Sequence, residues 1–169
     1  MLSEKMVKEL NNQINEELFS SYLYLSMSSY CNAQGLAGFS NWMRVQAQEE
    51  LSHATKIFDY LLERNAQVTL GSIEQPKHEW KDLLNVFEET LAHEKHITGR
   101  FNLLMSVAVE EKDYATQSFL KWFIDEQVEE ESNVDTMLSK LKLIGDNTSA
   151  VFYLDQEAST RVYVAPTAE

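Results

Sequence analysis

Long stretches without helix breakers are the feature that most constrains how this chain can fold. Apolar residues recur at three- and four-residue intervals, which is the α-helical period, and the 169 residues include only 5 Gly and 2 Pro. Strands have few suitable positions in such a pattern. We therefore expect an all-α fold, and breaks in the pattern predict helices at about 4–32, 38–64, 77–112, 113–144 and 148–161, with a loose tail at 162–169.

Residues with capping preferences support these boundaries. Ser3 and Asp113 suit helix N-caps, and Gly35 and Gly145 suit the residues that end a helix. Because little chain joins the third and fourth helices, they must be antiparallel neighbours. The one long connection, 65–76, can run along the side of a bundle about 42 Å long. The predicted architecture is a single-domain four-helix bundle with one long crossover and a short fifth C-terminal helix.

The charge balance restricts the possible partners. The chain has 14 Lys+Arg and 27 Asp+Glu, a formal net charge of −13, whereas nucleic acids and anionic membranes require local positive potential. Cations are therefore better suited as binding partners of this chain. The single cysteine, Cys31, excludes an intramolecular disulfide framework and a Cys-rich metal module, and it fits a reducing compartment. Residues 1–10 lack the apolar core of a signal peptide and no apolar run is long enough for a membrane span, so we expect a soluble, cytoplasmic protein.

Each of the four long predicted helices carries a glutamate on its apolar face. In the first helix this inward stripe is expected to include Tyr24 and Leu25 as well. The glutamates also lie near the middles of their helices, at Glu17, Glu50, Glu94 and Glu130. Mid-helix positions on inward stripes of an up-and-down bundle converge at one level along its axis. The pattern therefore predicts that four carboxylates meet inside the bundle.

Four ionised carboxylates can be buried together only if cations neutralise them. No Lys or Arg lies on these stripes, whereas two divalent ions would supply four positive charges. His53 follows Glu50 by three residues, so it adds a nitrogen ligand on the same helix face. Carboxylate and imidazole ligands together suit iron or manganese better than calcium or structural zinc. We predict a two-metal site.

Other polar residues allow two interpretations each. The acidic group of Glu49, Glu126 and Glu129 is either a solvated charged face or a third cation site. Tyr24 lies two turns beyond Glu17 and is either a ligand-bonding or electron-donating group or a core tyrosine with a satisfied hydroxyl. Isolated histidines are more typical of a surface than of a metal site, and the chain has three: His78, His93 and His96.

Four segments of the chain together resemble the ferritin family, and most closely its bacterial non-haem branch. They are NEELFSSYLY (15–24), QEELSHA (48–54), HEKHI (93–97) and FLKWFIDEQVEEE (119–131). Each segment alone is a weak signal. Their order and separations make the resemblance specific, and it covers nearly the whole chain.

The resemblance implies a role for each candidate residue. A first iron would be held by Glu17, Glu50 and His53. Glu50 would bridge to a second iron, held by Glu94 and Glu130, with Gln127 beside it. A third iron site would use Glu49, Glu126 and Glu129, with Glu130 shared, and Tyr24 would be the tyrosine next to the site.

The resemblance also implies an activity. Ferritins of this kind are ferroxidases that oxidise Fe²⁺ with O₂ or peroxide and store ferric mineral in a hollow shell of 24 identical subunits, from which a ferredoxin-type reductant can release iron. Haem is not expected, because the position of a second Glu-x-x-His motif reads Gln127-x-x-Glu130. Ser52 also occupies the place of the haem-ligating methionine of bacterioferritins.

Other classes of protein remain open from the sequence. A di-iron oxygenase would need a reductase partner and a substrate tunnel. A rubrerythrin-like peroxidase would need a Cys-rich electron-donor domain, which Cys31 alone cannot provide. A purely structural bundle would direct all its acids to solvent. Mini-ferritins fit poorly, because they bind iron between subunits and the ligands expected here lie in one chain.

Overall fold

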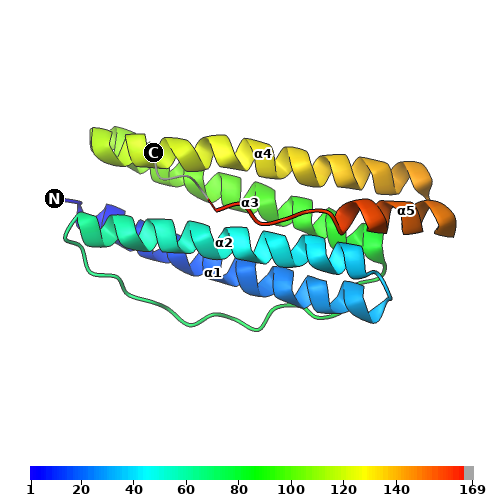
Figure 1. Ribbon diagram of the computed structural model, residues 1–169. Coiled ribbons are helices and arrows are strands. Elements are labelled where there is room, and N and C mark those ends of the chain that lie inside the picture. Colours follow the sequence, from blue (N-terminus) through cyan, green and yellow to red (C-terminus); the bar gives the residue numbers. More distant parts are fainter. Residues whose placement is uncertain (166–169) are drawn as a thin grey trace.

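The computed structural model describes residues 1–165, and every secondary-structure element assigned there is an α-helix (Figure 1). They are α1 (Glu4–Ala33), α2 (Ala37–Glu63), α3 (Leu83–Glu110), α4 (Tyr114–Ile144) and α5 (Thr148–Ala158). The expected all-α fold of four long helices and a short fifth one is confirmed. Of the expected loose tail, 162–165 follow α5 without regular structure, and 166–169 lie outside the described residues.

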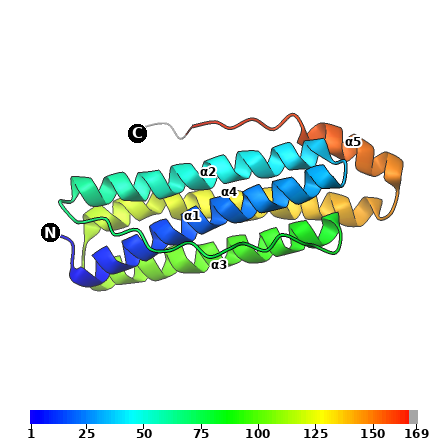
Figure 2. The same cartoon turned by 90° about the horizontal axis from the view of Figure 1, so that it is seen from below.

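The long helices are arranged as two antiparallel pairs (Figures 1 and 2). α1 packs along α2 and α3 packs along α4, while α1 also contacts α3. α5 lies at one end of the bundle, against α2 and α4. None of the helices in the described part of the chain is long and apolar enough to cross a membrane.

Side-chain caps explain where most helices begin. Ser3, Asp82, Asp113 and Asn147 each accept a hydrogen bond from a backbone N–H in the first turn of the helix that follows. Gly35 and Gly145 have φ angles of +79° and +51°, which glycine adopts without steric cost. The expected caps at Ser3 and Asp113 and the expected stops at Gly35 and Gly145 are thus confirmed.

Two helix boundaries differ from the prediction by more than two residues. α3 begins at Leu83 rather than at 77, because Asp82 caps it there and the residues before it contact Glu89 instead: Lys77 Nζ and Trp80 Nε1 donate to its two carboxylate oxygens, at 2.5 and 2.9 Å. α5 ends at Ala158 rather than at 161. The hydroxyls after it donate to carbonyl oxygens of its last turn, which competes with further helix.

α2 receives its N-terminal cap from another helix. The residue before it, Leu36, makes no side-chain cap. Instead, buried Asp155 of α5 accepts a hydrogen bond from the backbone N–H of Phe39 at 2.9 Å. Gly38 lies against this contact, and a Cβ atom there would be 1.7 Å from the carbonyl oxygen of Asp155. The docking of α5 on α2 therefore requires glycine at this position.

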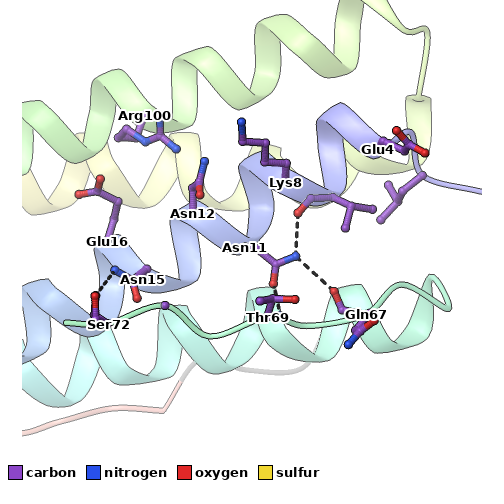
Figure 3. Close-up of a pocket in the computed structure, with 13 residues that line it drawn as sticks. Glu4, Lys8, Asn11, Asn12, Asn15, Glu16, Gln67, Thr69, Ser72 and Arg100 are labelled. Carbon is purple, nitrogen blue, oxygen red and sulfur yellow. Dashed lines mark hydrogen bonds between the residues drawn. The ribbon is translucent and has the colours of Figure 1, made fainter.

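The crossover from α2 to α3 runs along α1, held by two asparagines (Figures 2 and 3). Asn11 Nδ2 donates to the carbonyl oxygen of Gln67 at 3.2 Å, and Asn15 Nδ2 donates to that of Ser72 at 3.2 Å. A groove of about 830 Å³ opens at the surface between α1, the crossover and Arg100 of α3. The four mid-helix glutamates do not line it.

The core consists of two apolar clusters that lie on either side of the mid-helix glutamates. In α1, for example, Met6, Leu10 and Ile14 belong to one cluster and the apolar residues 23–31 to the other, with Glu17 between them. The same order along the chain, cluster, glutamate, cluster, occurs in α2, α3 and α4. The glutamates are therefore at one level of the bundle. Leu25, expected on the inward stripe, is instead 48% exposed, because the stripe of α1 passes through Leu23 and Met27.

Candidate metal centre

The four mid-helix glutamates are buried, with relative exposures of 3% or less. They come from four different helices: Glu17, Glu50, Glu94 and Glu130. In the described part of the chain, their one ion-pair contact within 4.0 Å is from His53 to Glu50. Buried carboxylates without cationic partners are unfavourable unless they are protonated or bind a metal ion.

Glu17, Glu50 and His53 form the tightest group. One ligand atom from each lies within 4.8 Å of the others, and this is the one such group of three or more found in residues 1–165. His53 Nδ1 is 3.2 Å from Glu50 Oε2. Two buried oxygens of this group, Glu17 Oε2 and Glu50 Oε1, have no hydrogen-bond partner among the described residues. Unpartnered buried acceptors are what a bound cation would satisfy, so these residues fit a metal ion.

Glu94 is held by two residues that the sequence also indicated. The hydroxyl of Tyr24 donates to Glu94 Oε1. Gln127 Nε2 donates to Glu94 Oε2 at 3.2 Å and is 3.3 Å from the Glu94 carbonyl oxygen. Tyr24 and Gln127 thus lie beside the glutamate of α3, and both are buried.

Two buried glutamines, which sequence reasoning missed as site residues, orient other carboxylates. Gln13 Nε2 donates to Glu17 Oε1 at 2.9 Å, and Gln46 Nε2 donates to Glu130 Oε2 at 2.5 Å. An arginine donates to the amide oxygen of each glutamine, Arg100 to Gln13 at 3.3 Å and Arg161 to Gln46 at 2.6 Å. Since guanidinium groups only donate, each arginine directs the amide N–H group of its glutamine toward the carboxylate. Gln46 does lie on the apolar stripe of α2, which is the signal that could have identified it.

Burial and mutual repulsion raise the pKa values of the central carboxyl groups. Burial, followed by the charge of Glu50, raises the pKa of Glu17 well above its usual range. The pKa of Glu50 is also raised well above its usual range, by burial and then by Glu94 and Glu130. That of Glu94 is about 8, because burial and Glu130 outweigh its hydrogen bonds. These groups hold protons that a bound metal ion would displace.

The second acidic group, Glu49, Glu126 and Glu129, is more exposed to solvent than the four mid-helix glutamates. Burial raises the pKa of Glu49 to about 7, although the charge of Arg161 opposes the shift. Arg161 Nη2 donates to Glu49 Oε2 at 2.5 Å. Burial also raises the pKa of half-buried Glu126, and Glu129 is exposed. Glu126 and Glu130 are close enough to Glu49 to raise its pKa further, but these acids do not form a tight ligand group like that around His53.

The three isolated histidines and Ser52 lie around the centre or away from it, and Trp122 packs beside its histidine. His78 and His96 are exposed, and His93 is half-buried with Nε2 2.7 Å from Ser20 Oγ. Trp122 packs edge-on against His53, with ring centres 5.4 Å apart. The hydroxyl of Ser52 donates to the carbonyl oxygen of Glu49 at 2.7 Å.

Fold and site together define a four-helix bundle with a carboxylate-rich candidate metal centre at mid-height. Residues 7–144 match the family model described as a ferritin-like domain. The chain is 39% identical over 163 residues to a bacterial non-heme ferritin of Staphylococcus aureus, covering 96% of this chain and 98% of that protein. It is 43% identical over 157 residues to a probable bacterial non-heme ferritin-like protein of Haemophilus influenzae, covering 93% and 95%. The chain belongs to the ferritin family.

Solved structures agree with this assignment. The open-pore ferritin of the hyperthermophilic archaeon Archaeoglobus fulgidus is 51% identical, with a TM-score of 0.95 over 96% of this chain and 100% of that one. An engineered closed form of the same ferritin is 50% identical, with a TM-score of 0.96 over 97% and 100%. The crossover and α5 thus have counterparts in ferritins of known structure.

Proposed function

We propose that this protein stores iron: it oxidises Fe²⁺ at a two-iron site within each subunit and retains the ferric product as a mineral. The observation that carries the proposal is a layer of four buried glutamates and His53, with two carboxylate oxygens unpartnered, between two apolar clusters. Relatives named bacterial non-heme ferritin, matched over nearly their whole length, support it.

The ligands divide between two iron ions. Glu17, Glu50 and His53 bind the first, which is supported by the proximity of their ligand atoms. Glu50 bridges to the second, which Glu94 and Glu130 bind. Gln127 assists at the second iron, and Tyr24 holds Glu94 through its hydroxyl, as their hydrogen bonds to Glu94 suggest.

Iron is the substrate of this reaction. Two Fe²⁺ ions lose one electron each, and O₂ takes up these two electrons and two protons to give H₂O₂. With H₂O₂ as the oxidant, the same two electrons and two protons give two molecules of water. Hard, anionic carboxylate oxygens favour Fe³⁺ over Fe²⁺, so the ligand set favours the ferric product. The protons that Glu17, Glu50 and Glu94 release on binding Fe²⁺ are available to the reduced oxygen.

Three further parts of the proposal rest on the family resemblance. Glu49, Glu126 and Glu129, with Glu130 shared, form a third iron site beside the first two. The chain assembles with identical copies into a closed shell of 24 subunits. A ferredoxin-type reductant returns the stored iron to solution.

Two measurements test the function. Size-exclusion chromatography should give a particle of roughly half a megadalton, 24 times the 19.5 kDa subunit, which turns amber without precipitating on aerobic addition of Fe²⁺. Glu50→Ala and Glu94→Ala should each slow the rise of ferric absorbance by about 100-fold, the loss expected when a ligand or its support is removed. Exposed Glu63 of α2 supplies a matched control, and Glu63→Ala should leave the rate unchanged.

Two outcomes of these measurements would contradict the proposed function. Normal oxidation rates in both Glu50→Ala and Glu94→Ala would refute the two-iron site. A small particle that consumes O₂ but retains no iron would indicate an oxygenase rather than a store.

A further inference from the structure

The segment after α5 runs back beside α2 (Figure 2). Its Arg161 side chain lies on a face of α2. Asn41 Nδ2 holds the backbone of this segment by donating to the carbonyl oxygen of Arg161 at 2.9 Å. The guanidinium carbon of Arg161 lies 4.2 Å from the centre of the Trp42 ring. Its two terminal nitrogens donate to Gln46 Oε1 at 2.6 Å and to Glu49 Oε2 at 2.5 Å. Every one of these partners belongs to α2, so α2 provides a specific binding site for this side chain.

The ion pair between Arg161 and Glu49 differs from the exposed pairs of this protein. Their side chains are only 18% and 20% exposed, whereas those of the pair between Lys140 and Glu157, also at α5, are 41% and 57% exposed. A partly buried pair is screened less by water and salt, and a guanidinium stacked on an indole loses less entropy when it binds. Arg161 therefore competes effectively for its carboxylate.

Arg161 is linked to two carboxylates of the proposed third iron site, one directly and one through Gln46. It binds Glu49 directly, and through Gln46 it reaches Glu130, because Gln46 donates to the Glu130 carboxylate. Both glutamates belong to the third iron site described under the proposed function. The guanidinium is thus a positive charge on the same carboxylates that a third metal ion would use.

We propose that Arg161 is a competing cation for the third iron. Glu49 Oε2 binds either the guanidinium or the metal ion, since a guanidinium and a divalent ion on one carboxylate oxygen repel each other strongly in a half-buried site. Arg161 consequently lowers the affinity of this site for the metal ion, and its side chain leaves Glu49 when the site fills. This inference rests on the proposed third site, and its failure would leave the proposed two-iron centre standing.

The first test is anaerobic calorimetric titration of the assembled protein with Fe²⁺, which measures binding without oxidation. Arg161→Gln should bind the third ion about tenfold more tightly than the wild type, the change expected on losing one charge-assisted hydrogen bond. The first ion should keep its affinity within about twofold, because within residues 1–165 neither Arg161 nor Gln46 bonds to its ligands Glu17, Glu50 and His53. The second ion should bind no more tightly than in the wild type, because Gln46 loses the arginine that orients it toward Glu130. Lys140→Gln removes one positive charge near α5 without touching Glu49, and it should behave as wild type.

The second test is a crystal structure of the wild type soaked anaerobically in Fe²⁺, with iron located by anomalous scattering. With an ion on Glu49, the Arg161 side chain should be off that carboxylate and off the Trp42 ring. Arg161 still bound to Glu49 beside the ion would overturn the inference, as would equal or weaker third-ion binding in Arg161→Gln. Only two ions in every variant would remove the third site and this inference with it, while leaving the two-iron centre intact.

Discussion

At the scale of single residues, the centre depends on the polar side chains that surround its ligands. Glu17 and Glu130 each accept a hydrogen bond from a buried glutamine that an arginine orients from outside. Such partners hold a carboxylate in position and stabilise its ionised form. The arginines come from α3 and from the segment after α5, so distant parts of the chain contribute to the geometry of one small site.

Gln13 offers a direct test of this support. Gln13→Leu should weaken binding of the first iron by about tenfold, because Glu17 would lose the donor to Oε1 while its Oε2 already has none. Anaerobic Fe²⁺ titration measures the change. Gln117→Leu is the matched control, since the Gln117 side chain donates to the carbonyl oxygen of Ala108 and not to a carboxylate of the centre. Unchanged affinity in Gln13→Leu would show that Glu17 needs no support.

The raised pKa of Glu94 predicts how stability depends on pH in chelator-treated protein. The folded carboxyl keeps its proton up to about pH 8, whereas the unfolded one releases it near 4.5. The folded state then binds more protons in this window, so stability is fully present below about 4.5 and is lost as the pH rises through about 8. The thermal unfolding midpoint should therefore fall between pH 5 and 8.

Two comparisons isolate the role of Glu94 in this effect. Glu94→Gln should show a shallower fall, because the amide mimics the protonated carboxyl. Zn²⁺ added before heating should also flatten the dependence, since the metal ion replaces the proton. A wild-type midpoint that rises from pH 5 to 8 would contradict the expectation.

At the scale of helices, the docking of α5 on α2 depends on one close approach. Gly38→Ala would place a Cβ atom 1.7 Å from the carbonyl oxygen of Asp155, and backbone cannot yield as a flexible side chain does. We expect a loss of about 3 kcal/mol in unfolding free energy or release of α5. Gly99→Ala is the matched control: no atom lies within 4 Å of its added Cβ in α3, so stability should rise by up to about 1 kcal/mol.

The helices also show what sequence can and cannot predict here. Periodicity and caps are local properties, so the long helices and the level of the four glutamates could be predicted from spacing alone. The start of α3 could not, because Trp80 and Lys77 pair with Glu89 rather than extending the helix. The position of Arg161 could not be predicted from the sequence either, because its partners lie on α2, more than a hundred residues earlier in the chain.

At the scale of the whole molecule, some apolar residues of α5 are exposed in the part of the chain that the structure describes. Phe152 and Tyr153 are exposed and contact each other at one end of the bundle. Exposed aromatic pairs of this kind are typical of interfaces. If the proposed shell covers them, Phe152→Asp combined with Tyr153→Asp should shift the size-exclusion profile to smaller species. Tyr114→Asp, at the opposite end of α4, tests whether any exposed aromatic has the same effect.

The two apolar clusters on either side of the glutamate layer have a consequence for the working life of the protein. Each cluster joins all four long helices, so their spacing does not depend on what lies between the carboxylates. We therefore expect the four-glutamate layer to keep its shape whether its carboxyl groups hold protons or metal ions. Such a subunit can bind and release metal ions over many cycles without rearranging its helices.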